Sequence, residues 1–159
     1  KLQVVVQLAY VGEAAADGSF WLAPQSPQHD GPETLLERLN REERNLPFRR
    51  GENDVRLVTR SRIAWVRPGA GVKAALVRPP AFAITRAEPV RVRLVDGTMF
   101  DGVLAMEMPQ EFNRASDFLN RDEDFFVLTS PSGTVILNKL HVLETQVFEA
   151  PPQLKRDAA

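Results

Sequence analysis

The chain of 159 residues has no cysteine, only two histidines and a single tyrosine. Without cysteine it can form no disulfide, no thiolate zinc site and no cysteine nucleophile. No apolar run reaches the roughly 18 residues that a membrane-spanning helix needs. Lys1-Leu2-Gln3 lacks both an initiator methionine and a secretory signal pattern. We therefore expect a trimmed or processed protein that is cytoplasmic, lies in a reducing compartment and does not insert into a membrane.

No catalytic constellation can be read from the residues that are present. His29 lies in a predicted loop and His141 on a predicted strand, and neither has a histidine or cysteine companion. The acidic run Asp122-Glu123-Asp124 lacks the spacing of a calcium loop. No glycine-rich turn precedes a helix as it does in a phosphate-binding loop. We therefore predict that the protein is not an enzyme and that it uses no cofactor and no metal.

What the sequence does contain is one short pattern that occurs twice. Leu39-Asn40-Arg41 matches Leu119-Asn120-Arg121, and an apolar pair follows each tripeptide. Upstream, Asp17-Gly18 occupies the place that Asp101-Gly102 occupies later. A module of about 60 residues is marginally stable alone, so two copies are expected to share an interface. A duplicated module suits binding or assembly better than catalysis, because an active site needs one asymmetric constellation.

The predicted organisation follows from this duplication. It consists of a first module at 1–67, a packed connector at 68–87, a second module at 88–148 and a mobile tail at 149–159. Each module combines short strand-like runs, tight turns and one helix. This pattern predicts a mainly β fold of two small, strongly bent antiparallel barrels that pack together. The connector is apolar enough that we expect it to pack, as a strand between the modules.

Local signals place the first helix and the turns. Residues 32–45 form the best helix candidate, with Asp30 and Glu33 as the capping pair. A turn is predicted near Asp17-Gly18, and hairpin-type turns are predicted at Asp96-Gly97 and Ser132-Gly133.

One stretch of the second module is similar to a segment of small bacterial domains that have no assigned activity. It reads Arg114-Ala-Ser116-Asp117-Phe118-Leu119-Asn120. Ser116 or Asp117 would cap the helical turn predicted at 115–120. The segment therefore has a structural purpose without any ligand.

Parts of the second module resemble the two signatures of Sm-like proteins. Residues 94–104 hold an apolar residue, then Gly97, then Gly102-Val103-Leu104 after four further residues. Residues 136–142 resemble the second signature, with Asn138-Lys139 where the family usually has arginine-glycine. The resemblance implies a small SH3-like barrel in which glycine permits a strongly bent strand.

In Sm-like proteins the polar residues at these places hold a flipped base, and subunits form rings by pairing edge strands. The resemblance therefore implies base contacts at Asn113, Asn138 and Lys139, with Thr59 and Arg60 as counterparts in the first module. The alternative interpretation is that Asn138-Lys139 and Thr59-Arg60 are turn residues between strands.

Charge is distributed unevenly along the chain. Residues 1–69 carry ten basic and nine acidic side chains, a net charge of +1, whereas residues 88–150 carry five and eleven, a net charge of −6. Such a difference can favour head-to-tail association. The alternative interpretation is that the two halves have unequal solvated surfaces. Several arginines also cluster around Trp65, and a basic strip with an aromatic side chain suits phosphates and a stacked base. The overall pI of about 6.2 lacks the basic excess of most nucleic-acid binders.

The function that these observations predict is a non-catalytic interaction or assembly module. It would bind a protein partner, or a second copy of itself in a homo-oligomer, through strand edges and complementary charged faces. The alternative is an Sm-like RNA-binding protein. The candidate nucleic-acid or partner contacts are Arg56, Arg60, Arg62, Trp65, Asn113, Asn138 and Lys139.

Overall fold

The computed structural model describes residues 1–79, 86–106 and 114–148. The first half contains β1 (Leu2–Tyr10), β2 (Ala16–Leu22), α1 (Leu35–Asn40), β3 (Asn45–Gly51), β4 (Asp54–Thr59), the 3₁₀ turn η1 (Arg60–Arg62) and β5 (Ile63–Pro68). The second half contains β6 (Arg86–Leu94), β7 (Met99–Met106), α2 (Ala115–Leu119), β8 (Phe125–Ser130), β9 (Gly133–Asn138), the 3₁₀ turn η4 (Lys139–His141) and β10 (Val142–Val147). The two halves thus share one order of elements, and the prediction of a mainly β fold is confirmed.

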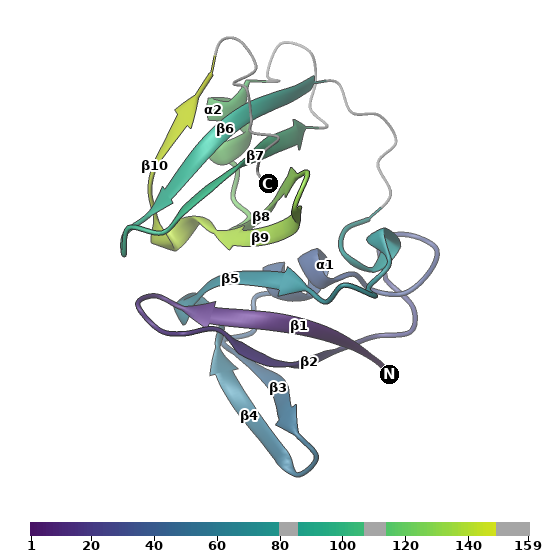
Figure 1. Cartoon of the computed structure of the whole chain (residues 1–159). Helices are drawn as coiled ribbons and strands as arrows, with labels where there is room; N and C mark the ends of the chain where they lie inside the picture. The colour runs from purple at the N-terminus through teal and green to yellow at the C-terminus, as the bar shows by residue number, and fades with distance from the viewer. Residues whose placement is uncertain (80–85, 107–113, 149–159) are drawn as a thin grey trace.

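All ten strands belong to one antiparallel sheet, in the order β10-β6-β7-β8-β9-β5-β1-β2-β3-β4. Within each half the fifth strand pairs with the first, and the first to fourth strands follow in sequence. The halves are joined where β9 pairs with β5 (Figure 1). The sheet does not close into a barrel, and among the described residues β4 and β10 each keep one edge without a strand partner.

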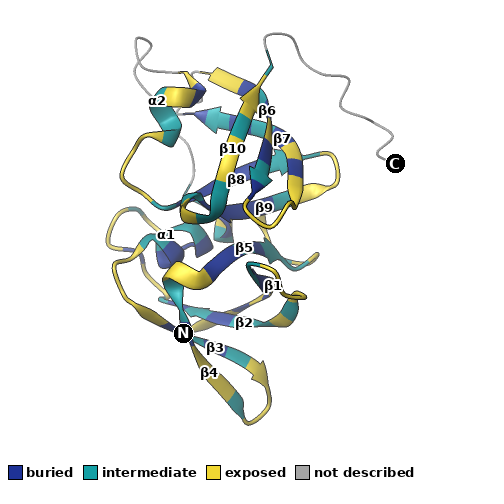
Figure 2. Cartoon of the chain, turned by 90° about the vertical axis from the view of Figure 1, so that its left-hand side faces the viewer, coloured by how far each residue is buried: buried dark blue, intermediate teal, exposed yellow. Residues whose placement is uncertain are grey.

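The core is shared between the halves along β8 and β9. Successive side chains of a strand point to opposite faces. Phe125, Val127 and Ile136 accordingly lie in the apolar cluster of the first half. Phe126, Leu128 and Leu137 lie in the cluster of the second half. Figure 2 shows these strands as largely buried at the level where the halves meet. The second half therefore completes the core of the first.

Each half has a glycine where its second strand crosses its third. A Cβ atom on Gly18 would lie 2.5 Å from the carbonyl oxygen of Arg49, and one on Gly102 would lie 2.5 Å from that of Thr129. Gly18 pairs with Val6, and Gly102 pairs with Val90. The bent strand expected at Gly102 thus has an equivalent in the first half. The turn predicted at Asp17-Gly18 is wrong, because both residues lie inside β2.

Helix α1 is shorter than residues 32–45 at both ends, because its cap lies further along the chain and the backbone becomes extended at Arg41. Thr34 is the N-cap: its Oγ1 accepts a hydrogen bond from the backbone of Glu37 (3.2 Å), whose carboxylate accepts one from the backbone of Thr34 (2.9 Å). The predicted pair of Asp30 and Glu33 is wrong. Glu33 instead accepts from the backbone of Ala23 (2.9 Å), the residue that follows β2.

The start of α2 is capped from a different element. The backbone N–H of Ala115 donates to Oε1 of Glu88 on β6 at 2.7 Å, in a buried position. Its N-cap, Arg114, makes no side-chain cap bond, so the expected cap by Ser116 or Asp117 is wrong. A carboxylate from a neighbouring strand satisfies the free donor at this helix start.

The connector packs on the first half as a turn. Residues 69–79 contain no strand, contrary to expectation, but hold the 3₁₀ turn η2 (Ala74–Leu76). Val77 is buried in the first cluster, and its carbonyl oxygen accepts a hydrogen bond from Leu36 at 2.9 Å. Of the rest of the predicted connector, Pro68 ends β5, Arg86 and Ala87 begin β6, and 80–85 lie outside the described residues. The predicted tail at 149–159 also lies outside them. The turn predicted at Asp96-Gly97 is confirmed. The turn predicted at Ser132-Gly133 is displaced by one residue, because Pro131 and Ser132 form it and Gly133 already begins β9.

Candidate functional site

The contact between the halves, which we call the joint, consists of the β5–β9 pairing and the polar groups around it. Trp65 pairs with Leu137, and Val66 pairs with Ile136. Above this short ladder the amide of Asn40 clamps the start of β8: Nδ2 donates to the carbonyl oxygen of Phe125 (3.1 Å) and Oδ1 accepts from its N–H (2.8 Å). One side chain therefore satisfies both backbone groups of a residue from the other half.

Charge reinforces the joint at Arg60. Its Nη2 lies 3.1 Å from Oδ2 of Asp124, and its guanidinium stacks over the ring of Phe125 at 5.5 Å from the centroid. On the other side of the joint, Nε2 of His141 lies 2.7 Å from the carbonyl oxygen of Ser61. Half-buried ion pairs of this kind are less screened than surface pairs. Arg60, one of the predicted contacts, is thus engaged inside the chain.

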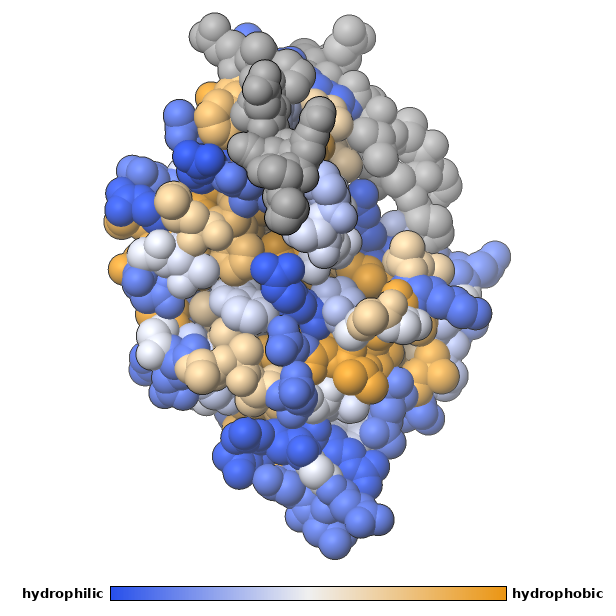
Figure 3. Space-filling view, in the orientation of Figure 1, coloured by the Kyte–Doolittle hydropathy of each residue, from blue (hydrophilic) through white to orange (hydrophobic). Residues whose placement is uncertain are grey.

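The free edges carry exposed apolar side chains. On β4, Val55 and Leu57 are exposed, Leu57 by 70%. On β10, Leu143 and Val147 are exposed, Leu143 by 54%. Figure 2 shows both strands with large exposed areas. The β3–β4 hairpin projects from the body (Figure 1), and its tip is strongly hydrophilic (Figure 3). Both strands that lack a partner on one side therefore display apolar side chains.

The structure does not unite the predicted arginine cluster into one basic strip. Arg56 is exposed but forms a two-point ion pair with Asp54, at 3.0 and 3.1 Å. Arg62 is exposed on η1. Trp65 is half-buried and packs edge-on against Phe100, with ring centroids 5.9 Å apart. Each of these side chains except Arg62 is thus used within the chain.

The residues implied by the Sm-like resemblance also have partners. Asn138 is fully buried; its Nδ2 donates to the carbonyl oxygen of Ile63 at 2.8 Å and its Oδ1 accepts from Leu140 at 3.0 Å. Lys139 is half-buried, and its Nζ donates to the carbonyl oxygen of Arg121 at 3.1 Å. Burial lowers the pKa of Lys139. Thr59 bonds Asn45 across β4 and β3, and Asn113 lies outside the described residues.

A cavity of about 460 Å³ opens where the halves meet. Its cationic side chains are Arg41, Arg78, Arg121 and Lys139, and Phe118 is among its apolar residues. Glu37 and Glu123 also line it. Arg78 forms no ion pair with any described residue. The cavity therefore combines an excess of positive charge with an aromatic wall.

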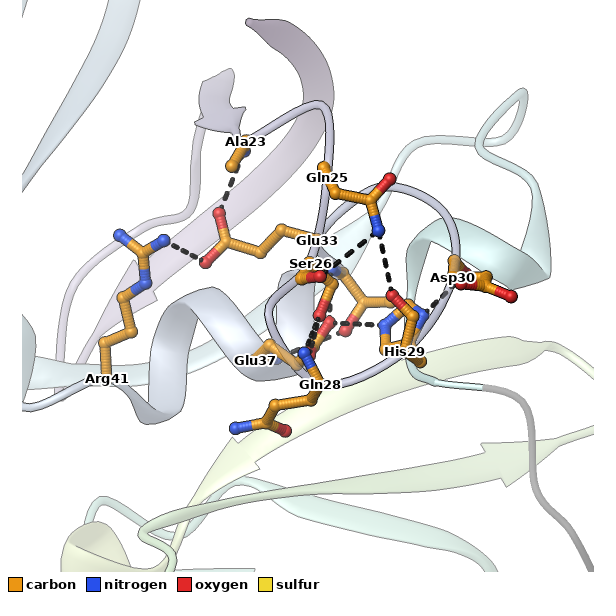
Figure 4. A network of polar contacts seen from close by, with 10 residues as sticks. Ala23, Gln25, Ser26, Gln28, His29, Asp30, Glu33, Glu37 and Arg41 are labelled. Carbon is orange, nitrogen blue, oxygen red and sulfur yellow. Dashed lines mark hydrogen bonds and ion pairs between the residues drawn. The ribbon is translucent and has the colours of Figure 1, made fainter.

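A polar network next to this cavity orders the loop between β2 and α1 (Figure 4). Burial raises the pKa of Glu37, but hydrogen bonds from His29, Thr34 and Ser26 outweigh it, so the net shift is downward. The pKa of His29 is raised. The largest cause is its hydrogen bond with the backbone carbonyl of Asp30, and the next is its hydrogen bond with the Glu37 carboxylate. Within the described residues no buried side-chain nitrogen or oxygen lacks a hydrogen-bond partner. The network is therefore closed and stabilises the loop.

Comparison with known proteins finds no family model, no curated protein and no solved structure that matches this chain. Across residues 1–79, 86–106 and 114–148, no group of three or more acidic, histidine or cysteine side chains could hold a metal ion. None of the described helices has the length and apolar character required to cross a membrane.

The sequence predicts contacts at Arg60 and Trp65, which lie in the joint, but it does not predict the clamp by Asn40 or the exposed edges. Asn40 was identified as part of a repeat, but its bond to Phe125 depends on residues far apart in the chain. A signal was nevertheless present. Phe125-Phe126-Val127-Leu128 is apolar at every position, whereas Asn45-Leu46-Pro47-Phe48 alternates. A continuous apolar run is typical of a strand that is buried on both faces.

Proposed function

We propose that the protein is a non-catalytic assembly module made of two tandem, strongly bent, barrel-like units. It binds a protein partner, or a second copy of itself, through the free edges of β4 and β10. The observation that carries this proposal is the exposure of apolar side chains on both edges.

The physical reason lies in the chemistry of strand edges. A free edge presents unpaired N–H and C=O groups that another strand can satisfy, and proteins usually protect such edges with charge, proline or cover. Here β4 displays Val55 and Leu57, and β10 displays Leu143 and Val147. A strand added to such an edge gains backbone hydrogen bonds, and the exposed side chains add apolar contact.

We expect Leu57→Lys and Leu143→Lys each to weaken association at least about tenfold, because a charge would have to be desolvated at the contact. The free energy of unfolding should change by no more than about 0.5 kcal/mol, since both side chains are exposed. Light scattering across a concentration series measures self-association, and pull-downs measure a protein partner.

The matched control for these variants is Val5→Lys. Val5 is comparably exposed but lies on β1, which is paired on both sides by β2 and β5. It should leave association unchanged. Edge variants that associate as well as the wild type, with themselves or with a captured partner, would refute the proposal.

The second candidate function is binding of single-stranded RNA, as the Sm-like resemblance implies. The cavity at the joint favours it, because Arg78, Arg121 and Lys139 line it together with Phe118. A basic groove with an aromatic platform suits a phosphate and a stacked base.

RNA binding should show a steep dependence on salt, because each phosphate contact releases counterions. We expect an oligouridine probe to bind at low salt in fluorescence anisotropy, and Lys139→Gln to reduce the log–log salt slope by about one. Glu52→Gln, on the distant β3–β4 turn, serves as the control. Absence of binding at low salt would eliminate this candidate.

A further inference from the structure

We infer that the occupant of both edges is a second copy of this chain: β10 of one molecule pairs with β4 of the next, in the register of the internal joint. This inference rests on the proposed function and specifies its partner. Its basis is that the joint already pairs a fourth strand, β9, with a fifth strand, β5. The free edges are again a fourth strand and a fifth strand.

The correspondence between the halves fixes the register. Thr59, which ends β4, corresponds to Asn138, which ends β9, and Ile63 at the start of β5 corresponds to Val142 at the start of β10. The internal pairs are Trp65 with Leu137 and Val66 with Ile136. Transferred to the free edges, these pairs become Glu144 with Val58 and Thr145 with Leu57.

Several features of the joint recur at the free edges. Asn120 ends the second helix as Asn40 ends the first, and it is exposed, with its Nδ2 bonded only to the Ser116 carbonyl of its own helix. The residue it would clamp is Asn45, which starts β3 as Phe125 starts β8. Leu57 occupies the place of Ile136, which is buried in the joint. The half with a net charge of +1 would also meet the half with −6.

Two contacts of Arg60 do not transfer. Asn45 stands where the joint has Phe125, so the stacking of Arg60 over that ring has no counterpart. The ion pair between Arg60 and Asp124 becomes Lys139 against Arg44, so two cations meet where the joint has opposite charges. Arg44 is exposed and has no ion pair with a described residue. The acidic groups Asp122, Glu123 and Asp124 act on Lys139 through space, as does Arg121. None of them lies within ion-pair distance of its ammonium group. Association between copies is therefore weaker than the internal joint.

Arginine-to-aspartate substitution at position 44 tests this mismatch. Arg44→Asp recreates the charge pattern of the joint, and we expect the dissociation constant for self-association to fall about tenfold, with Arg44→Gln intermediate. Sedimentation equilibrium of the full chain measures the constant. An unchanged or weaker association of Arg44→Asp would overturn the charge assignment.

The absence of cysteine makes the register directly testable. The double variant Leu57→Cys/Thr145→Cys should form a ladder of covalent oligomers under mild oxidation, because each molecule offers one cysteine to each neighbour. Each single variant should remain monomeric on a non-reducing gel. The double variant Leu57→Cys/Val147→Cys, displaced by two residues along β10, should cross-link much less.

The outcomes separate this inference from the proposed function. Dimers of the single variant Leu57→Cys would show that β4 edges meet symmetrically, which overturns the head-to-tail arrangement but keeps the edges as the binding surface. A chain that stays strictly monomeric and forms no ladder also overturns the inference. In that case the proposed function still stands if a protein partner captured by the wild type is lost in Leu57→Lys. If neither self-association nor partner capture responds to the edge variants, both are refuted.

Discussion

Gly18→Ala and Gly102→Ala are each expected to lower the free energy of unfolding by about 3 kcal/mol or more, a large effect for one methyl group. In both halves the added Cβ would lie 2.5 Å from a carbonyl oxygen of the crossing strand. At Gly18 it would also lie 2.4 Å from the ring of Phe48. Because the closest backbone atoms belong to a paired strand, the contact can be relieved only by moving β3 or β8.

Urea unfolding of the two variants measures this effect, with Gly71→Ala as the control. No atom lies within 4 Å of a Cβ built on Gly71. Its replacement should change the free energy of unfolding by no more than about 0.5 kcal/mol. A loss below about 1 kcal/mol at Gly18 and Gly102 would show that the strands separate easily at these crossings. It would also remove the close approach as the reason for glycine there.

Much of the secondary structure follows from local patterns in the sequence. Period-two alternation, hairpin turns and the Leu39-Asn40-Arg41 repeat predict short strands and one helix in each half, as the structure has them. The capping residues were assigned wrongly, because Glu33 and Glu88 bond to backbone groups of other elements. A carboxylate can satisfy any nearby donor, so sequence spacing alone does not decide which one it caps.

The single sheet could not be predicted, because it depends on a pairing between distant segments. The register of β5 on β9 rests on the two pairs Trp65 with Leu137 and Val66 with Ile136. Local propensity is the same whether β9 ends a separate barrel or continues into another half. The two cases differ in whether the strand is buried on both faces. In β9, Val135, Ile136 and Leu137 are all buried. In β4 the corresponding positions carry Arg56, Leu57 and Val58, of which only Val58 is buried.

The contact between the halves also explains why the residues predicted to bind a ligand do not form an exposed binding site. In the sequence, Asn138 and Arg60 are polar groups near a pinch between strands, and this position predicts exposure to a ligand. In the structure a neighbouring half covers that pinch, so that Asn138 bonds Ile63 and Arg60 bonds Asp124. Polar groups that would face solvent in an isolated half thus become interface groups where the two halves meet.

Asn40→Ala should lower the free energy of unfolding by about 2–4 kcal/mol, whereas Asn120→Ala should change it by no more than about 0.5 kcal/mol. Removing the Asn40 amide leaves both the N–H and the C=O of Phe125, a residue that is 2% exposed, without their partners. Asn120 is exposed, and its side chain makes one bond to its own helix. Urea unfolding of the two variants makes a matched comparison, because both asparagines end a short helix in the same tripeptide.

An Asn40→Asp variant refines this comparison, because the carboxylate can still accept from the N–H of Phe125 but can no longer donate to its C=O. We expect the free energy of unfolding of Asn40→Asp to lie between those of the wild type and Asn40→Ala. Equal effects of Asn40→Ala and Asn120→Ala would mean that Asn40 contributes only as a helix end. In that case the apolar contacts of Phe125, Val127 and Ile136 would hold the halves together without the clamp.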